Sequence, residues 1–198
     1  AVVGAAPLDF GVRRRMDTVV NLVAEPGDAA LRLLMADVLG WLGDIGAAVV
    51  NGLDAYVVGS SPARQLALFA HLGLSHPPAR VLRDPAAVGV ALAELGLAEA
   101  DAEVLDGPPA VVRERVGGRR VRLEFAGGRL VGDDAGLPEV VVAAAAEVLG
   151  TAAVEFGGVT LARDGERVWW LGADTRPGVS PAALGALAEH VRFRAGLG

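Results

Sequence analysis

The stretch from Gly150 to Gly178 constrains the fold more than any other part of this 198-residue chain. Two apolar runs, residues 154–161 and 168–171, flank the dipeptide Asp164-Gly165, which is typical of a tight turn between antiparallel strands. The pattern therefore predicts a β-hairpin. Its second strand leads to Asp174, and this hairpin is the part of the chain around which a function would have to be built.

The amino-terminal part of the chain predicts a β-α-β unit. Residues 18–24 form a short Val-rich run that is typical of a buried strand, and residues 47–50 form a second one. Between them, apolar residues recur at helical spacing over 31–42, after a turn and cap at residues 26–28. A crossover of this kind predicts two parallel strands joined in a right-handed sense.

Serine or aspartate followed by proline predicts the start of three further helices. Ser61-Pro62 and Asp84-Pro85 each place a capping side chain before a proline at the first helical position, and Ser180-Pro181 repeats the pattern near the end. The second of these helices is expected over residues 84–96. An alanine-rich helix is expected over residues 138–150.

Residues 110–132 predict a meander of antiparallel strands. The pairs Gly117-Gly118 and Gly127-Gly128 are two-residue turn signals. Between them, Val121, Leu123 and Phe125 alternate with charged residues, which indicates a strand with one face buried.

Several stretches resemble the ATP-grasp superfamily, in particular its glutamate-ligase-like (RimK-like) carboxylate–amine ligases. They are NGLDAYVVGSSPARQ, GLSHPP, RERVGGRRVRLEFAGGRL and LGADTRPG. The resemblance implies an α/β fold that is α+β in its carboxyl-terminal half, with an antiparallel sheet packed by helices. It also implies an amino-terminal segment, residues 1–83, and a shortened ATP-grasp-like domain, residues 84–198.

The resemblance also assigns residues to the family's nucleotide site. Glu114 matches a position on the nucleotide-facing strand, and Arg122 matches an arginine near the phosphates and the acyl substrate. The three magnesium ligands of the family fall on Thr160, Gly172 and Asp174, so Asp174 alone keeps a metal-binding side chain.

Two features with which the family holds and covers the ATP phosphates are missing here. A lysine that contacts the ATP phosphates in the family falls on Pro62, and all 18 basic residues of this chain are arginine. Only residues 97–109 remain where the family has a longer segment with a glycine-rich flap, so the flap subdomain is expected to be largely missing. Phosphoryl transfer depends on such preorganised cations and on exclusion of water.

Two residue sets admit a second interpretation. Asp174 is either a surviving magnesium ligand or a turn residue that pairs with Arg176. The arginines of residues 113–122 either form an anion-binding face or keep exposed strands soluble. They are Arg113, Arg115, Arg119, Arg120 and Arg122.

Composition limits the partners of this chain. The net charge is −6, which disfavours binding along a nucleic-acid backbone. No apolar run approaches the roughly 20 residues of a membrane span. The sequence contains no cysteine, which agrees with a reducing compartment, and we expect a cytoplasmic protein.

Together these features predict a degenerate ATP-grasp-like protein without catalytic activity that acts as a binding or regulatory subunit. The alternative is an ATP-dependent carboxylate–amine ligase with an altered nucleotide site. The first hypothesis predicts weak or absent Mg-ATP binding. It also predicts a homo-oligomer or a protein partner, with residues 110–132 or the Trp169-Trp170 strand at the contact.

The match to the magnesium ligands of the family requires a particular geometry of the hairpin. Thr160, Gly172 and Asp174 must lie on one face of the sheet, whereas a strict two-residue turn at Asp164-Gly165 would separate them. We therefore expect a longer loop or a β-bulge, with Gly165 at a positive φ.

Overall fold

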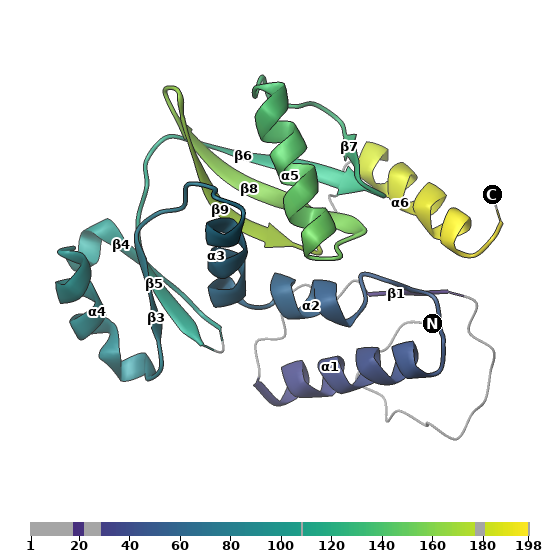
Figure 1. Cartoon of the computed structure of the whole chain (residues 1–198), viewed down its shortest axis with the longest axis horizontal. Coiled ribbons are helices and arrows are strands. Elements are labelled where there is room, and N and C mark those ends of the chain that lie inside the picture. Colours follow the sequence, from purple (N-terminus) through teal and green to yellow (C-terminus); the bar gives the residue numbers. More distant parts are fainter. Residues whose placement is uncertain (1–17, 22–28, 108, 177–180, 198) are drawn as a thin grey trace.

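The computed structural model describes residues 18–21, 29–107, 109–176 and 181–197. These residues form two antiparallel sheets, a parallel pair of short strands and the helices that pack on them (Figure 1). None of the described helices is long and apolar enough to cross a membrane. The elements follow in the order β1 (Val19–Val20), α1 (Ala29–Asp44), β2 (Val49–Val50), α2 (Leu53–Gly59), α3 (Pro62–His71), β3 (Ala79–Leu82), the 3₁₀ helix η1 (Pro85–Ala87), α4 (Val88–Leu95), the 3₁₀ helix η2 (Glu99–Asp101), β4 (Ala102–Leu105), β5 (Ala110–Glu114), β6 (Arg119–Ala126), β7 (Arg129–Val131), α5 (Glu139–Thr151), β8 (Phe156–Asp164), β9 (Arg167–Asp174) and α6 (Pro181–Arg194).

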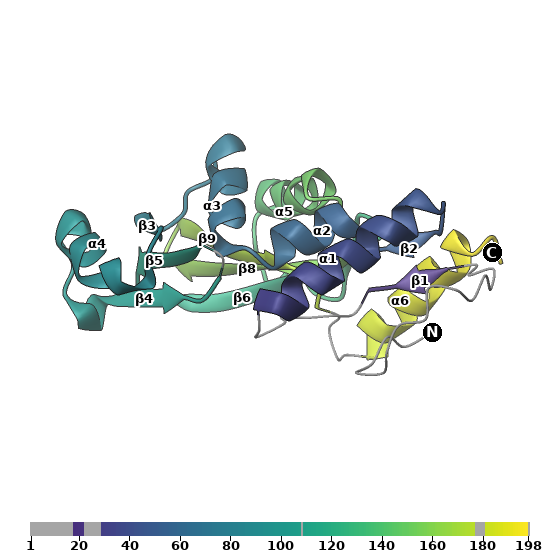
Figure 2. The ribbon, with the colours of Figure 1, turned by 90° about the horizontal axis from the view of Figure 1, so that it is seen from below.

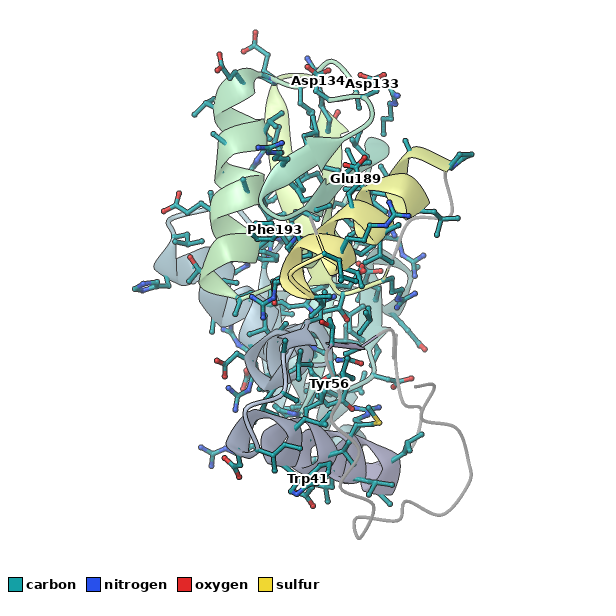
Figure 3. The ribbon with its side chains drawn as sticks, turned by 90° about the vertical axis from the view of Figure 1, so that its right-hand side faces the viewer. Trp41, Tyr56, Asp133, Asp134, Glu189 and Phe193 are labelled. Atoms are coloured by element: carbon teal, nitrogen blue, oxygen red, sulfur yellow. The ribbon has the colours of Figure 1, made fainter. Side chains whose placement is uncertain are left out.

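The predicted β-α-β unit is confirmed. β1 and β2 pair in parallel through two residues each, with α1 between them in the sequence. The expected cap at residues 26–28 and the end of the first predicted strand lie outside the described residues. α1 buries one apolar stripe against α2. Tyr56 of α2 lies between the two helices and packs on this stripe (Figure 3). That stripe consists of Met35, Val38, Leu39 and Leu42.

α2 is a helix that the sequence did not predict. It follows directly after Asn51, a fully buried residue with a positive φ of 56°. The Asn51 side chain donates to the Phe156 carbonyl at 2.5 Å and accepts the Glu155 and Phe156 amides at 3.0 Å each. This one amide therefore joins the amino-terminal unit to the start of β8.

The larger sheet has the strand order β7-β6-β8-β9. The alternation predicted for β6 is confirmed, because Val121, Leu123 and Phe125 are buried and the residues between them are not. These side chains pack with Trp170 and with one face of α5. α6 lies on the opposite face of the sheet, over Ala126 and Phe156 (Figure 2).

The smaller sheet has the strand order β3-β5-β4 and carries α4 on one face. β4 lies within residues 97–109, where no strand was predicted. β3 precedes the predicted domain boundary after residue 83, and it pairs with β5 beyond that boundary. The Asp84 cap of the following helix is confirmed, since its side chain accepts the Ala86 amide at 2.9 Å.

One predicted hairpin is wrong. Gly127-Gly128 does join two paired strands, β6 and β7. Gly117-Gly118, in contrast, connects β5 of the smaller sheet to β6 of the larger one, and these strands do not pair. Gly118 has a φ of 93°, and a Cβ there would overlap the Arg163 backbone. The glycine is required for this close approach rather than for a tight turn.

The predicted bulge in the last hairpin is confirmed. From the turn, where Gly165 has a φ of 61°, the strands pair in register as far as Leu161 opposite Trp170. The next pair is Thr160 opposite Gly172, so Leu171 is an extra residue in β9. Thr160, Gly172 and Asp174 consequently lie on the same face of the sheet.

Asn51 generates the first testable prediction. Asn51→Ala removes three hydrogen bonds, leaves buried backbone groups unpaired and places alanine at a positive φ, which should lower the free energy of unfolding by about 3 kcal/mol. Asn51→Gly removes the same hydrogen bonds but tolerates the backbone, and it should be less destabilising by about 1 kcal/mol. Urea unfolding measures both variants. Wild-type stability in Asn51→Ala would contradict the structural role assigned to this residue.

Candidate functional site

A cleft of about 360 Å³ lies between the two sheets, against the outer strand β9. Its wall includes residues of α1, the α2–α3 junction, β4, β5, β6, β8 and β9. Figure 1 shows α3 between the two sheets at this place. The charged residues of the lining are Arg32, Asp106, Arg113, Arg120, Asp174 and Arg176.

β9 is an edge strand whose outer backbone groups are bound by other elements. The Trp170 amide donates to the Ser75 carbonyl at 2.9 Å, and the Ala173 amide donates to Oε1 of Gln65 at 3.2 Å. Gln65 also donates to the carbonyls at the end of α2, Val58 and Gly59, at 3.1 Å each. Gln65 therefore fixes α2 and α3 against the cleft side of β9.

Arg113 lies on β5 of the smaller sheet, and its side chain reaches β9 of the larger sheet. Its side chain is 5% exposed, and its Nε donates to Oε1 of Glu103 at 2.6 Å. Its Nη1 donates to the carbonyl of Leu171, the bulged residue, at 2.5 Å. Arg120 lies near the same carboxylate, 3.7 Å from Oε2 of Glu103, with 57% of its side chain exposed. One arginine is thus held rigidly and the other loosely.

Arg122 and Asp174 form a bidentate ion pair across the sheet. Nη1 lies 2.7 Å from Oδ2 and Nη2 lies 2.9 Å from Oδ1. The Arg122 Nε also donates to Glu124 at 3.3 Å, and Nη2 donates to the Arg176 carbonyl at 3.0 Å. The Arg176 amide donates to Oδ1 of Asp174 at 2.8 Å. Both oxygens of Asp174 are therefore engaged within the chain.

Gly158 makes this ion pair possible. It lies on β8 between the two charged residues, opposite Glu124 on one side and Asp174 on the other. A Cβ on Gly158 would lie 2.7 Å from the Arg122 Cζ. The guanidinium thus crosses β8 over the space that a side chain at residue 158 would fill. Sequence reasoning missed this residue, because a glycine next to Gly157 in a strand gives no sign of what passes over it.

The pKa of Arg122 lies above its usual value. Burial lowers it, but the hydrogen bond and the negative charge of Asp174, followed by those of Glu124, raise it by more. The pair with Asp174 therefore favours the charged form of the guanidinium.

The structure brings together two of the three predicted site residues. Arg122 and Asp174 are paired, and Asp174 faces the cleft with Thr160 and Gly172. Glu114 lies on the other face of β5, because Arg113 is the residue that faces the cleft and side chains alternate along a strand. Glu114 is opposite Ala102, which packs with α4.

The arginines of residues 113–122, which were predicted as a possible anion-binding face, do not all lie on one surface. Arg113 and Arg120 line the cleft, and Arg122 lies beside it, bound to Asp174. Arg115 instead donates to the Ala102 carbonyl at 3.0 Å, and Arg119 is exposed. The cleft also contains Arg32, from a distant part of the chain that no local pattern connected with the site, and Arg176, two residues after Asp174.

The observed residues do not fit a magnesium site of the kind that the resemblance implies. Asp174 is the one carboxylate at the three matching positions, and its oxygens bind Arg122 and the Arg176 amide. Thr160 and Gly172 bring no carboxylate to replace it. Among the residues that the structure describes, no three His, Asp or Glu side chains are grouped so as to hold a metal ion.

This arrangement of two sheets around a cleft is a shortened ATP-grasp fold. No family model and no curated protein matches the sequence. Among solved structures, a RimK domain ATP-grasp protein from Sphaerobacter thermophilus DSM 20745 superposes with a TM-score of 0.70 at 19% identity, covering 96% of this chain and 85% of that one. The ATP-grasp ligase PsnB, solved with its precursor peptide PsnA2 and AMPPNP, gives 0.61 at 16% identity, covering 90% and 77%.

A third structure of the same fold is D-alanine–D-alanine ligase from Bacillus anthracis, complexed with ATP. It gives a TM-score of 0.59 at 14% identity and covers 83% of this chain and 76% of that one. At these identities the three likenesses show the fold alone. They confirm that the motifs of the sequence indicated the correct fold.

The Arg122–Asp174 pair generates the second prediction. Arg122→Ala and Asp174→Ala should show a coupling energy of about 1–2 kcal/mol in a double-mutant cycle, because the pair is bidentate and only partly exposed. In a Gly158→Ala background the coupling should fall close to zero, since both charges remain but the path of the guanidinium is blocked. Urea unfolding of the eight proteins measures both cycles.

The matched control is Gly150→Ala, on α5, where a Cβ meets nothing within 4 Å. The coupling energy should be unchanged in that background. An equal coupling in the Gly158→Ala and wild-type backgrounds would mean that the guanidinium does not need the space above residue 158.

Proposed function

We propose that this chain is a non-catalytic ATP-grasp-like protein that acts as a binding or regulatory subunit. The observation that carries the proposal is the Arg122–Asp174 ion pair. Asp174 is the one carboxylate at the positions matched to metal ligands, and an internal guanidinium already binds both of its oxygens. A permanent side-chain cation thus takes the place in which catalysis would need an exchangeable metal ion.

We expect magnesium to bind weakly at Asp174. It binds nucleotide phosphates through carboxylates placed around an octahedron, together with water. To reach Asp174, the ion would have to displace Arg122 and would then lie beside a charged guanidinium. Phosphoryl transfer to a carboxylate depends on metal ions that bridge the phosphates and neutralise the developing charge. These conditions oppose ligase chemistry in this cleft.

The alternative function is an ATP-dependent carboxylate–amine ligase in which arginines replace the missing lysines. The observation that favours it is the presence of four arginines in the cleft lining. Of these, Arg113 is held by Glu103 and the Leu171 carbonyl, so it contributes a fixed rather than an adjustable charge. Pro62, at the position matched to a phosphate-binding lysine, also lines the cleft.

A protein partner remains part of the proposal, and the exposed apolar surface that supports it lies on α1 rather than at the Trp169-Trp170 strand. Trp170 is buried, and the Arg167 guanidinium lies 3.7 Å from the ring centre of Trp169, so neither indole forms an open apolar surface. Exposed leucines gather instead on α1, where Leu33 is 70% exposed beside Leu31 and Leu34. PsnB, which has this fold, was solved with a precursor peptide, so a polypeptide partner is compatible with the scaffold.

Turnover with Mg-ATP provides the third prediction. The protein should neither hydrolyse ATP nor ligate an amine to a carboxylate, and Mg²⁺ should not strengthen ATP binding in titration calorimetry. A magnesium-dependent dissociation constant in the low micromolar range, about −8 kcal/mol, together with turnover that Asp174→Asn abolishes, would establish the ligase instead. Glu147→Gln, an exposed change on α5, is the control and should have no effect in either case.

Association provides the fourth prediction. The wild-type protein should elute as a homo-oligomer or co-purify with a partner from its native host, because exposed apolar side chains cluster on α1. The double change Leu33→Ser/Leu34→Ser should abolish this association. Val140→Ser on α5 removes a similarly exposed apolar side chain and should leave association unchanged. A wild-type monomer without any partner in light scattering and co-purification would refute a partner role.

A further inference from the structure

A cavity of about 640 Å³ lies between α6 and the hairpin of β6 and β7, away from the cleft. None of its lining residues lines the cleft between the two sheets. β7 forms one border of the cavity, and the side chains of Glu189, His190 and Phe193 on α6 form the other. Figure 3 shows the molecule from this side, with Glu189 and Phe193 on α6.

His190 fixes α6 against the hairpin. Its Nε2 lies 3.0 Å from Oε2 of Glu155, and the carbonyl of Glu155 accepts the Gly127 amide at 2.7 Å. A Cβ on Gly127 would lie 3.0 Å from Nδ1 of His190, so this glycine lets the ring approach the turn closely. Phe193 follows on the same helix, with its ring centre 6.5 Å from that of His190, and it is 74% exposed. The cavity thus combines a fixed wall with an aromatic ring that is largely open to solvent.

β7 is an outer strand of the larger sheet and has unpaired backbone groups. Gly127 and Gly128 both have a positive φ, which makes the turn before β7 a type I′ turn closed by the hydrogen-bonded pair Ala126 and Arg129. Leu130 is the next residue, so its N–H and C=O groups point away from β6. Within the described part of the chain, nothing bonds to them. β7 therefore offers a hydrogen-bond donor and an acceptor beside the cavity.

Two charges of opposite sign line the cavity. Arg129 lies on the same face of β7 as Val131, which packs against α6, and Glu189 lies on α6. Among the residues that the structure describes, neither Arg129 nor Glu189 has an ion pair or hydrogen bond through its side chain. Other charged residues belong to the same region without lining the cavity: Asp133, Asp134, Arg192 and Arg194. A ligand with one acidic and one basic group therefore complements the lining.

We propose that β7 and this cavity bind an extended segment of a partner protein, which adds to the larger sheet as a further strand. Its main chain bonds to Leu130, and its alternate side chains enter the cavity. The residues of the segment that lie opposite Arg129 and Val131 are on the α6 face. The segment accordingly carries an apolar residue for the space beside Phe193, between an acidic residue for Arg129 and a basic residue for Glu189.

A second copy of this chain fits the site less well. β7 has three residues, so two copies paired through it would bury much less than the roughly 800 Å² per partner of a stable interface. The strand reads Arg-Leu-Val, so a second β7 would bring no acidic residue to Arg129. A short segment needs less area, because its main chain and one anchoring side chain supply the contacts.

Two synthetic peptides test this proposal on the full chain by NMR titration. The sequences Thr-Glu-Thr-Phe-Thr-Lys-Thr and Thr-Lys-Thr-Phe-Thr-Glu-Thr place the three required side chains on one face and correspond to the two strand directions. One of them should bind at submillimolar concentration and slow hydrogen exchange of the Leu130 amide about tenfold. Replacing its phenylalanine by alanine should weaken binding about tenfold. Absence of binding at millimolar concentration, or binding without protection of this amide, would overturn the proposal.

Variants of the protein locate the contact. Phe193→Ala should weaken binding of the selected peptide about tenfold. Leu184→Ala is the matched control, because Leu184 is an exposed apolar residue of α6 outside the cavity, and it should leave binding unchanged. Glu189→Lys should also weaken binding, and exchanging the lysine of the peptide for glutamate should restore it. Equal effects of Phe193→Ala and Leu184→Ala, or no restoration by the exchanged peptide, would refute the cavity as the site. Thermal melting establishes that the variants fold.

This contact is separate from the apolar surface on α1 and does not depend on whether the cleft is catalytic. Leu33→Ser/Leu34→Ser should therefore leave peptide binding unchanged. Magnesium-dependent turnover would refute the proposed non-catalytic function without affecting this inference. Absence of peptide binding would refute this inference alone.

Discussion

The bulge at Leu171 is the constraint on which the site depends. If β9 continued in the register of its turn, Asp174 would pair with Gly157 and face α5, among the apolar side chains around Trp170. An ionised carboxylate in such a core would cost several kcal/mol or would have to take up a proton. One extra residue turns the end of the strand over, so that Asp174 faces the cleft and Arg122 can reach it. The register of the backbone thus decides which side chains can meet in the site.

The same bulge also ties the two sheets together. A bulged residue leaves the ladder with an unpaired carbonyl, which is costly when it is buried. Arg113, from the smaller sheet, donates to this Leu171 carbonyl and is itself neutralised by Glu103. The interaction that satisfies the bulge therefore also sets the distance between the two walls of the cleft. Gln65 acts similarly at the Ala173 amide, so the edge of β9 is covered without any further strand.

The sequence was most informative where the cause of a structure is local. Ser61-Pro62 and Asp84-Pro85 begin helices as expected, and the demand that Thr160 and Asp174 share a face required the bulge that is found. Three features were missed, two of which depend on partners far away in the chain. α2 follows Asn51, whose positive φ is supported by hydrogen bonds to residues about 105 positions later, and β4 exists because β5 pairs with it. The Arg122–Asp174 pair needs the empty space above Gly158, which becomes visible only when three strands are aligned.

An internal cation changes what the ATP-grasp scaffold needs to be stable. A site that relies on a metal ion has an acidic strand end whose charge is balanced only when the ligand is bound. Here Arg122 supplies that balance from within the chain, through its bidentate pair with Asp174. The end of β9 is therefore ordered by the chain itself, and the remaining arginines of the cleft face a wall that is already formed. In the non-catalytic role proposed for this chain, such a preorganised wall would serve binding, because the carboxylate at the end of β9 is neutralised by Arg122 rather than by an exchangeable ion.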